Sequence, residues 1–452
     1  MSALMAACST AHYPLNPPLA AIDGSSGYRG ERFFAADPND HLFVHVSFSG
    51  GGARAAALGF GVLETLKDAA ITWEGKPRRL VDEIDVVMGV SGGSMMATAF
   101  ALHGADGLGE FKTRFFDADL QDDLVADMLL PWNAWRLTSA TYGRSDLFAE
   151  FLDRRIYQGA TFGMLSQRLR KPFAIIYAAD MANGARFEFN QDQFDFLCSD
   201  LDGVSLGRAV AASSAAPLVL SPVVFLNHAP ANNAAGCGEP LLLARSGEAS
   251  FRGRSKRAAQ MATLREPSPE GGTRRYVHLL DGGLSDNVNT TGPLEYFEQF
   301  GGFVRAARHV GYRGVRRAVF IVVNAETSRR SSVDATPEIP GLMSTAFALA
   351  DIPINRNSET SLQKMRASIQ QWEAEVNAAH AQGDFDVFAE DAKFYLVEVD
   401  LRVHPEGSGL VDLESVPTSL QLPPKDIDAL RRFARDTLNR SDEFQRLIGD
   451  LH

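Results

Sequence analysis

Short apolar runs, small-residue turns and helical patterns alternate near the start of the chain. Residues 41–49 (HLFVHVSFS) form a β-rich run that ends in consecutive glycines. Residues 55–68 carry apolar side chains at helical spacing, residues 84–89 (IDVVMG) form a second apolar run, and residues 92–102 suit another helix. The repeated order of strand, glycine turn and helix predicts a parallel sheet with helical crossovers.

The same patterns continue to the end of the chain. We predict further strands at residues 173–179, 276–280, 318–324 and 394–400, helices at 119–163, 358–379 and 426–447, and a loop-like stretch at 227–275. The apolar stripe of residues 358–379 favours docking on the sheet over a role as a lid. Because the last strand comes late, we expect one α/β sheet that the C-terminal part completes, and no clean cut into two domains.

Composition and charge restrict the classes of partner. The 452 residues are 45% hydrophobic and carry a net charge of -12, so general attraction to nucleic acid or to an anionic membrane is not expected. Residues 86–102 and 209–227 contain no charged side chain, but glycines, serines or prolines interrupt both, which favours buried core over a membrane span. Any membrane contact must therefore come from local patches.

A G-x-S-x-G pattern follows the second predicted strand, as Gly89-Val90-Ser91-Gly92-Gly93. A serine on a sharp strand-to-helix turn needs small neighbours, such as Gly89 and Gly93, to lift its hydroxyl clear of the backbone. The following helix directs its N-terminal N–H groups at the reacting centre. Ser91 is thus a candidate nucleophile, and the alternative is a tight turn with a structural serine.

A glycine-rich loop, Ser49-Gly50-Gly51-Gly52-Ala53-Arg54, ends the first predicted strand. Consecutive glycines let backbone amides approach a phosphate or an oxyanion closely. Ala55 stands where a dinucleotide fingerprint needs its third glycine, and no lysine follows as in a Walker loop. An oxyanion hole formed by residues 50–54 is the better interpretation, in which Arg54 holds the loop or meets a head group.

The third motif is Asp281-Gly282-Gly283, which ends the apolar run 276–280. In an open parallel sheet the ligand lies at the carboxyl ends of the strands, so Asp281 is expected near Ser91. A carboxylate held there accepts the serine proton directly. The alternative is an aspartate that caps a turn.

Together the three motifs closely resemble those of the patatin family, in the family's order: SGGGAR, GVSGG and DGG. Residues 212–217 (ASSAAP) and 281–287 (DGGLSDN) also look like family segments, and the likeness covers roughly residues 42–324. The SGGGxRAAA run and the N-terminal cysteine look like those of bacterial lipoprotein-type patatins. Ala55 departs from the glycine of many patatins.

The resemblance implies a three-layer α/β/α fold with a mostly parallel sheet and a helical C-terminal extension. It divides the chain into a signal remnant or tether (1–40), a catalytic domain (41–330) and a C-terminal region (331–452) that adds a late strand and helices. It implies a serine lipid acyl hydrolase of phospholipase A or lysophospholipase type, in which Asp281 deprotonates Ser91 and amides around Gly51 and Gly52 hold the oxyanion. No metal or cofactor is required, and the partner is a lipid.

Two other chemistries remain open at this point. A Ser-His-Asp esterase would need a histidine after the acid, and His309, His380 and His404 follow Asp281, although none has glycine support at a strand end. A lipid acyltransferase would use the same acyl-enzyme. His278 lies inside a predicted strand and is expected in the core.

The N-terminus bears on localisation. Residues 4–8 (LMAAC) resemble the end of a bacterial lipoprotein signal, in which Cys8 would be lipidated, although only seven residues precede it and none is basic. Cys198 and Cys237 would form a disulfide in an envelope compartment and stay free thiols in the cytosol. We expect the cell envelope, with a cytoplasmic location as the alternative.

Peripheral contact with a membrane is expected, but the sequence leaves open which residues make it. Trp132 and Trp135 suit a lipid interface, and a basic loop (Arg252, Arg254, Lys256 and Arg257) suits anionic head groups. For each we favour the simpler interpretation, a packed aromatic cluster and a solvated basic loop. The sequence does not set the oligomeric state.

Overall fold

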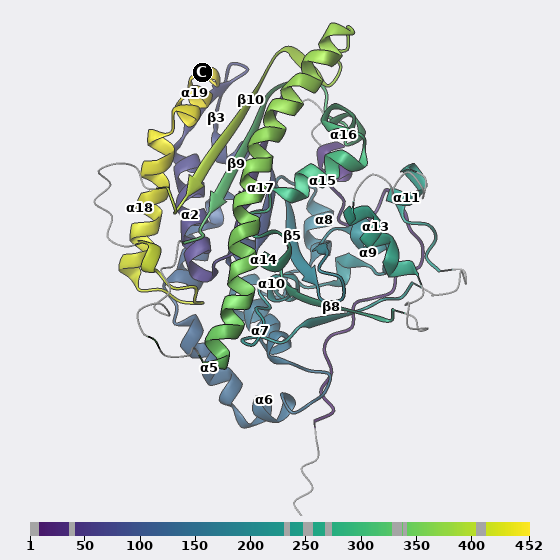
Figure 1. The fold of residues 1–452 in the computed structure, drawn as a ribbon, viewed down its shortest axis with the longest axis vertical. Helices are drawn as coiled ribbons and strands as arrows, with labels where there is room; N and C mark the ends of the chain where they lie inside the picture. The colour runs from purple at the N-terminus through teal and green to yellow at the C-terminus, as the bar shows by residue number, and fades with distance from the viewer. Residues whose placement is uncertain are drawn as a thin grey trace, which may run out of the picture.

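The computed structural model describes residues 9–35, 41–229, 236–246, 256–266, 274–327, 337, 341–403 and 413–452. A single large sheet runs through the molecule in the strand order β10-β9-β1-β4-β5-β8-β7 (Figure 1). Its strands are β1 Leu42–Phe48, β4 Ile84–Val90, β5 Phe173–Asp180, β7 Val223–Leu226, β8 Tyr276–Asp281, β9 Val315–Asn324 and β10 Phe388–Asp400, with β6 Arg186–Glu188 paired to β5. β2 Ala70–Trp73 and β3 Lys76–Arg79 form a separate hairpin that the sequence patterns did not predict.

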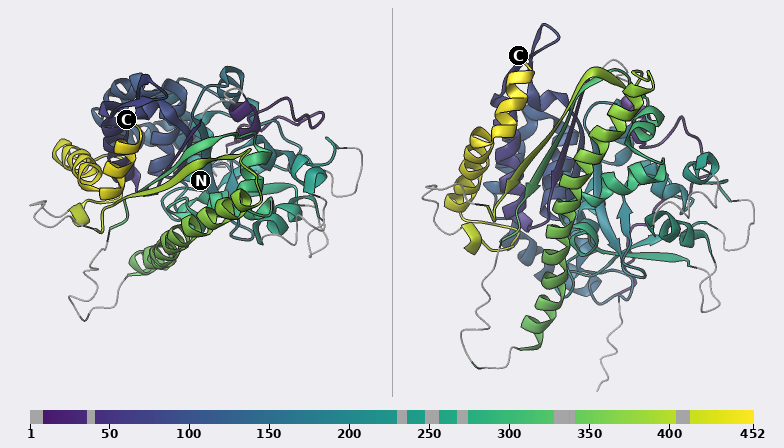
Figure 2. Two further views of the ribbon diagram at one scale, coloured as in Figure 1. Left: turned by 90° about the horizontal axis from the view of Figure 1, so that it is seen from above. Right: turned by 45° about the horizontal axis from the view of Figure 1, so that its top comes forward.

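The sheet is covered on both faces, which gives the predicted three layers (Figure 2). Along β1, Val44 and Val46 join the core cluster of α2 (Gly52–Asp68), α3 (Gly92–His103), α18 (Pro424–Arg440) and α19 (Asp442–Asp450). On β9, Phe320 faces the other layer, α15 (Thr291–Gln299), α16 (Phe303–His309) and α17 (Leu342–Ala381). This alternation follows from the two-residue repeat of a strand buried on both faces.

Strand direction differs from the expectation at one decisive place. β10, β9, β1, β4 and β5 are mutually parallel, as predicted, but β8 runs antiparallel to β5. β8 pairs only with the last residues of β5, with Asp281 opposite Ala178, so it enters from beyond the carboxyl edge and ends at that edge. Asp281 therefore lies at the predicted carboxyl edge of the parallel strands. It does so because an antiparallel strand ends there, and not because β8 is itself a parallel strand.

The predicted helices are found at the expected positions, but several begin or end at other residues than predicted. The predicted helix at 358–379 is the C-terminal part of α17, and its stripe (Leu362, Met365, Ile369, Trp372 and Val376) is buried as expected. The predicted helix at 426–447 is two helices, α18 and α19, because the chain turns at Ser441, whose side chain caps α19. The remaining helices are α1 Gly30–Ala35, α4 Leu108–Phe111, α5 Leu120–Leu129, α6 Pro131–Arg136, α7 Arg144–Leu152, α8 Phe162–Arg168, α9 Gln191–Asp195, α10 Leu206–Ser213, α11 Leu241–Ser246, α13 Lys256–Ala262 and α14 Gly283–Asp286.

Three expectations about exposure and order are wrong. His278 is exposed, because β8 lies near the edge of the sheet and turns alternate side chains outward. Trp132 is 66% exposed and packs only partly, against Trp135. The stretch 227–275 contains helices α11 and α13. Of the basic residues expected to form a solvated loop, Arg252 and Arg254 lie outside the described part of the chain, as do Cys8 and His404, whereas Lys256 and Arg257 begin helix α13.

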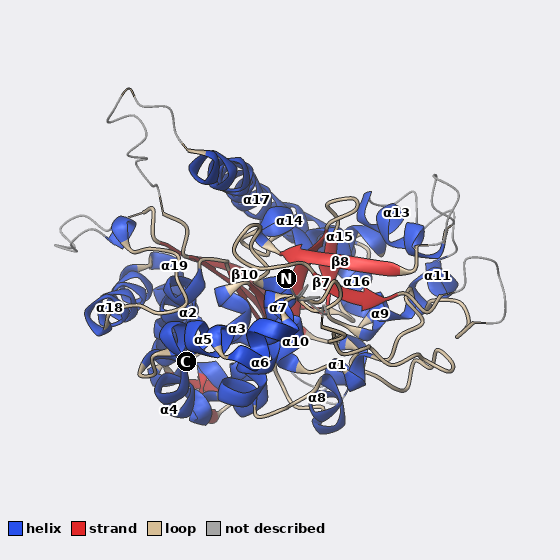
Figure 3. Cartoon of the chain, turned by 90° about the horizontal axis from the view of Figure 1, so that it is seen from below, coloured by secondary structure: helices blue, strands red, loops and turns tan. Residues whose placement is uncertain are grey.

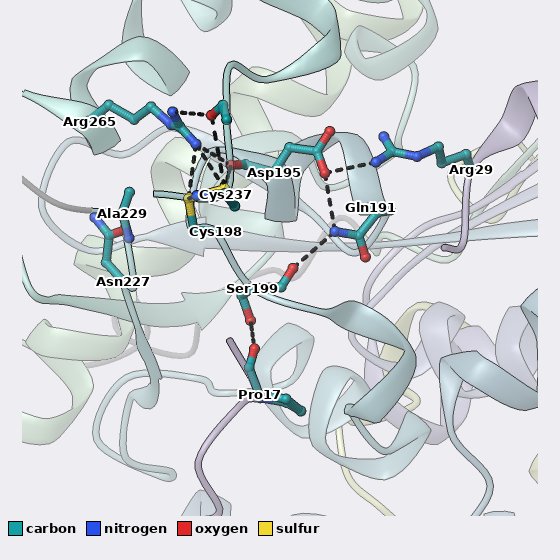
Figure 4. The surroundings of a disulfide bond; sticks show 11 residues. Pro17, Arg29, Gln191, Asp195, Cys198, Ser199, Asn227, Ala229, Cys237 and Arg265 are labelled. Atoms are coloured by element: carbon teal, nitrogen blue, oxygen red, sulfur yellow. Dashed lines mark hydrogen bonds and ion pairs between the residues drawn. A yellow bond between two sulfur atoms is a disulfide. The ribbon is translucent and has the colours of Figure 1, made fainter. Parts of the chain in front are cut away.

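A disulfide joins Cys198 to Cys237, with their Cα atoms 5.5 Å apart (Figure 4). It lies in a polar network centred on Asp195, whose carboxylate accepts hydrogen bonds from Arg29 at 2.8 Å and Gln191 at 3.2 Å. The Arg265 guanidinium donates to the Asp195 carbonyl oxygen at 2.9 Å and lies 3.1 Å from the Cys198 sulfur. The disulfide and this network fasten the end of α9 to the segment that precedes α11.

The N-terminal segment runs along the same region. The Asn16 side chain donates to Ser199 Oγ at 2.7 Å, and the Leu19 N–H donates to the Cys198 carbonyl oxygen at 2.7 Å. Tyr28 and Arg29 are buried. Residues 9–28 thus lie against the body of the α/β fold. Among the residues described, no helix combines the length and the apolar character that a bilayer crossing needs.

Candidate active site

Ser91 occupies a sharp turn between β4 and α3. Its backbone has φ 50° and ψ −123°, a strained region for a residue with a side chain. A Cβ at Gly89 would lie 2.6 Å from Ser94 Cα, and one at Gly93 would lie 2.4 Å from the Ser49 carbonyl oxygen. Only glycine fits these two positions, so the G-x-S-x-G pattern forms the predicted elbow.

Asp281 lies beside Ser91 at the end of β8. The Ser91 side chain lies close enough to the Asp281 carboxylate to lower its pKa, and the Gly283 N–H donates to Asp281 Oδ1 at 2.8 Å. Desolvation by the surrounding protein is the largest effect on this group and raises the pKa of Asp281 to about 6. The carboxylate is therefore largely ionised at neutral pH and still basic enough to accept a proton.

One short segment at the end of α10 fixes both residues. Ser213 Oγ accepts the Ser91 N–H at 2.8 Å, and the Ser213 carbonyl oxygen accepts the Gly282 N–H at 3.1 Å. Two residues later, the Ala215 carbonyl oxygen accepts the Asp281 N–H at 3.0 Å. The elbow and the aspartate turn, 190 residues apart in sequence, are thus held in register by residues 213–215.

The glycine-rich loop lies against the elbow. Gly51 has φ 137° and Gly52 has φ 59°, conformations that favour glycine, and a Cβ at Gly92 would lie 1.9 Å from the Gly52 carbonyl oxygen. The Gly50 N–H donates to the Asn287 carbonyl oxygen at 3.1 Å and the Ala53 N–H to that of Ser419 at 2.7 Å. Within the described residues, the Gly51 and Gly52 amides have no such partner. The loop therefore offers these two donors for an oxyanion.

The Arg54 side chain anchors the glycine-rich loop to neighbouring backbone. The side chain is buried, with Nε donating to the Ala325 carbonyl oxygen at 2.8 Å and Nη1 to that of Val416 at 2.5 Å. Of the two roles considered for Arg54, this geometry favours holding the loop. Ala53 likewise serves the loop's structure, because its N–H is already occupied.

Three supporting residues escaped sequence reasoning. Ser213 lies in ASSAAP and Asn287 ends DGGLSDN, so the resemblance marked both segments without assigning roles. The Asn287 side chain fills the space beside Gly50, where a Cβ would lie 2.5 Å from Asn287 Oδ1. Ser419 gave no signal, since its backbone carbonyl makes the contact and any residue type supplies one.

The two described histidines that were considered for a catalytic triad contact groups other than Ser91 and Asp281. His309 Nε2 lies 2.7 Å from Glu31, and His380 Nε2 lies 3.0 Å from the Phe388 carbonyl oxygen. Among the described residues, no group of three or more His, Cys, Asp or Glu side chains is arranged to hold a metal ion. An apolar cavity of about 120 Å³ lies on the α15–α16 face of the sheet, and neither Ser91 nor Asp281 lines it.

Comparison with known proteins places this geometry in a family. No curated protein matches the chain. Among solved structures it is similar to human GIVD cytosolic phospholipase A2, at 12% identity and a TM-score of 0.44, over 93% of this chain and 65% of that one. It is also similar to VipD from Legionella pneumophila, at 11% identity and a TM-score of 0.34, over 100% of this chain and 73% of that one. Residues 46–294, more than half of the chain, match the family model described as Patatin-like phospholipase, and the chain therefore belongs to the patatin-like phospholipase family.

Proposed function

We propose that the chain is a lipid acyl hydrolase that cleaves a fatty-acyl ester with a Ser91–Asp281 pair. Membership of the patatin-like phospholipase family supports a lipid hydrolase in general. The observation that carries the specific proposal is the position of the Asp281 carboxylate beside the Ser91 turn, both held by Ser213 through the Ser91 N–H and the Gly282 N–H. Beside this pair lie two backbone amides, of Gly51 and Gly52, that have no partner among the described residues.

The residues suit an acyl-enzyme mechanism. Asp281 accepts the Ser91 proton as Oγ attacks the acyl carbonyl carbon, and the Gly51 and Gly52 amides stabilise the oxyanion. Protonated Asp281 then donates to the departing alcohol oxygen, and the ester bond breaks. Water attacks the acyl-serine with Asp281 again as base, which releases the fatty acid and regenerates Ser91.

Trapping with a fluorophosphonate, followed by peptide mass mapping, tests this proposal. We expect the label on Ser91, and no label and no esterase activity in Ser91→Ala. Asp281→Asn should lose activity, whereas His309→Ala and His380→Ala should retain it. Label on another residue, or full activity in Asp281→Asn with loss in a histidine variant, contradicts the Ser-Asp pair. Product analysis separates hydrolysis from transfer, because a transferase yields an acylated acceptor instead of free fatty acid.

We further propose that the protein works in the bacterial cell envelope. The lipoprotein-like residues 4–8 and the disulfide between Cys198 and Cys237 support this location independently, because disulfides persist mainly in oxidising compartments. Fractionation of the native host followed by mass spectrometry of the N-terminal peptide tests it. An acylated Cys8 in the membrane fraction is expected, and an unmodified cytosolic protein with free thiols contradicts it.

A further inference from the structure

Four large apolar side chains stand exposed where α5 meets α6. Leu129 is 74% exposed, Leu130 51%, Trp132 66% and Trp135 40%, and the two tryptophan rings lie 5.0 Å apart. We call Leu129, Leu130, Trp132 and Trp135 the apolar cap. Scattered exposed apolar residues are ordinary, but a contiguous group that contains two tryptophans indicates an interaction surface.

Contacts of the polar side chains of α6 with the rest of the protein hold the apolar cap towards solvent. Asn133, between the tryptophans, is buried and its side chain donates to the Asp127 carbonyl oxygen at 2.9 Å. Arg136 donates to Glu150 at 2.9 Å and lies over the Tyr142 ring. Pro131 starts α6 with the fixed φ that suits a first helical position. The polar face of α6 is thus fixed to the protein, which leaves its tryptophan face in solvent.

Charge does not oppose apolar binding at this place. The acidic residues of α5 nearest the apolar cap are paired, Asp123 with Arg155 at 2.7 Å and Asp127 with Arg154. With a net charge of -12, the chain as a whole offers no general attraction to anionic lipid. A binding mode based on apolar insertion is therefore the one that the residues favour.

The apolar cap lies at the same end of the molecule as the active site, and α5 runs from the cap towards that site. At the other end of α5, the Gln121 N–H donates to the Gln421 side chain at 3.2 Å, and Ser419, two residues earlier, supports the glycine-rich loop through Ala53. On the other side of the site, exposed Leu218 and Val219 follow Ala215, which holds Asp281. Seen from below, α5, α6, α7 and α10 gather at this end of the molecule (Figure 3).

The N-terminal segment meets the body at the same place. The Ser9 N–H donates to Thr138 Oγ1 at 3.2 Å, and Thr138 Oγ1 donates to the Trp135 carbonyl oxygen at 2.8 Å. Cys8, the residue expected to carry a lipid, is bonded directly to Ser9. Ser9, which follows the residue expected to carry a lipid, is therefore fixed beside the apolar cap.

We propose that the apolar cap docks the enzyme on a lipid bilayer by inserting its tryptophans and leucines into the interface. The active site at the same end of the molecule and the position of Ser9 select a bilayer over a second copy of the chain as the occupant. Tryptophan suits this depth, because its ring is apolar and its N–H can meet the headgroup layer. The docking surface goes beyond the proposed chemistry and is tested without catalysis.

The test uses the full chain with Ser91→Ala, which prevents lipid hydrolysis, and Cys8→Ser, which excludes an acyl anchor. Binding to phosphatidylcholine and phosphatidylethanolamine vesicles is measured by co-sedimentation and by quenching of tryptophan fluorescence with brominated lipid. Only four tryptophans are present, and Trp73 and Trp372 are buried, so quenching reports on the apolar cap. The variant is Trp132→Ser with Trp135→Ser. The control is Phe385→Ser, an exposed aromatic just beyond the opposite, upper end of α17 (Figure 1).

We expect the parent to bind with quenching, and the double variant to show a partition coefficient at least about tenfold lower, while Phe385→Ser binds like the parent. Binding should change little between low and high salt, because apolar burial drives it. The proposal is overturned if the parent does not bind, if the double variant binds equally well, or if both variants lose binding alike. A concentration-dependent dimer that only the double variant abolishes would assign the surface to a second copy instead.

Discussion

Ser213 Oγ lies 2.8 Å from the backbone nitrogen of Ser91 and accepts its N–H. This bond fixes the strained turn that presents Ser91, while the carbonyl oxygen of the same serine holds the Gly282 N–H beside Asp281. One residue outside the proposed pair thus helps to position both of its members.

Replacement of Ser213 by alanine should therefore slow chemistry more than binding. We expect kcat to fall about 10- to 100-fold with little change in KM, because a small displacement of the nucleophile disturbs the attack geometry. The rate of fluorophosphonate labelling of Ser91 should fall in parallel. Ser214→Ala is the matched control, since the neighbouring hydroxyl is also buried but has no partner among the described residues. Equal losses in both variants would argue for general disruption of α10.

The raised pKa of Asp281 predicts the acid limb of the pH profile. Only the ionised carboxylate accepts the Ser91 proton, so kcat/KM should fall as pH drops through about 6. A profile of kcat/KM for a soluble ester between pH 4 and pH 8 measures this midpoint. An acid limb near pH 4, the range of an unperturbed aspartate, would contradict the buried setting of the carboxylate.

The same group should reduce stability at neutral pH. Its pKa is raised from 3.8 to about 6 on folding, so the folded state holds the proton more tightly and gains stability at low pH, which it loses as pH rises through about 6. Asp281→Asn removes this loss. Its melting temperature should exceed that of the parent at pH 7 to 8, and the difference should shrink towards pH 4. A gain that is independent of pH would point to a cause other than ionisation.

Gly92→Ala should destabilise the fold strongly, because its Cβ would lie 1.9 Å from the Gly52 carbonyl oxygen. We expect a loss of about 3 kcal/mol or more in the free energy of unfolding, together with loss of esterase activity, as the glycine-rich loop is pushed from the elbow. Gly109→Ala is the control, since this helical glycine is exposed and a methyl group added to it would meet no atom within 4 Å. Urea unfolding should show it neutral, or up to about 1 kcal/mol more stable.

The disulfide should contribute to stability through the unfolded chain. Cys198 and Cys237 are separated by 39 residues, for which the loop-entropy relation gives about 4 kcal/mol. Cys198→Ala with Cys237→Ala should lower the melting temperature, and a reducing agent should lower that of the parent but not that of the double variant. An unchanged parent under reducing conditions would show that the bond does not form in solution.

The sequence by itself determined the local parts of this protein. The elbow at Ser91, the glycine-rich loop, the aspartate turn and the parallel run of strands follow from steric demands and periodicities within a few residues, which is why their positions could be predicted. The family's order of motifs also led to the prediction that Ser91 and Asp281 belong to one site.

Only the tertiary structure decided what depends on partners distant in the chain. The antiparallel course of β8, the clamp from Ser213, the support of Ala53 by Ser419 and the exposure of Trp132 each depend on which segments pack together across 100 residues or more, or on what fails to cover a side chain. An apolar run shows the same pattern whichever direction its strand takes. A tryptophan is likewise the same residue in the sequence whether the fold buries it or leaves it exposed. The free energy of long-range packing distinguishes such alternatives, and local pattern carries little of it.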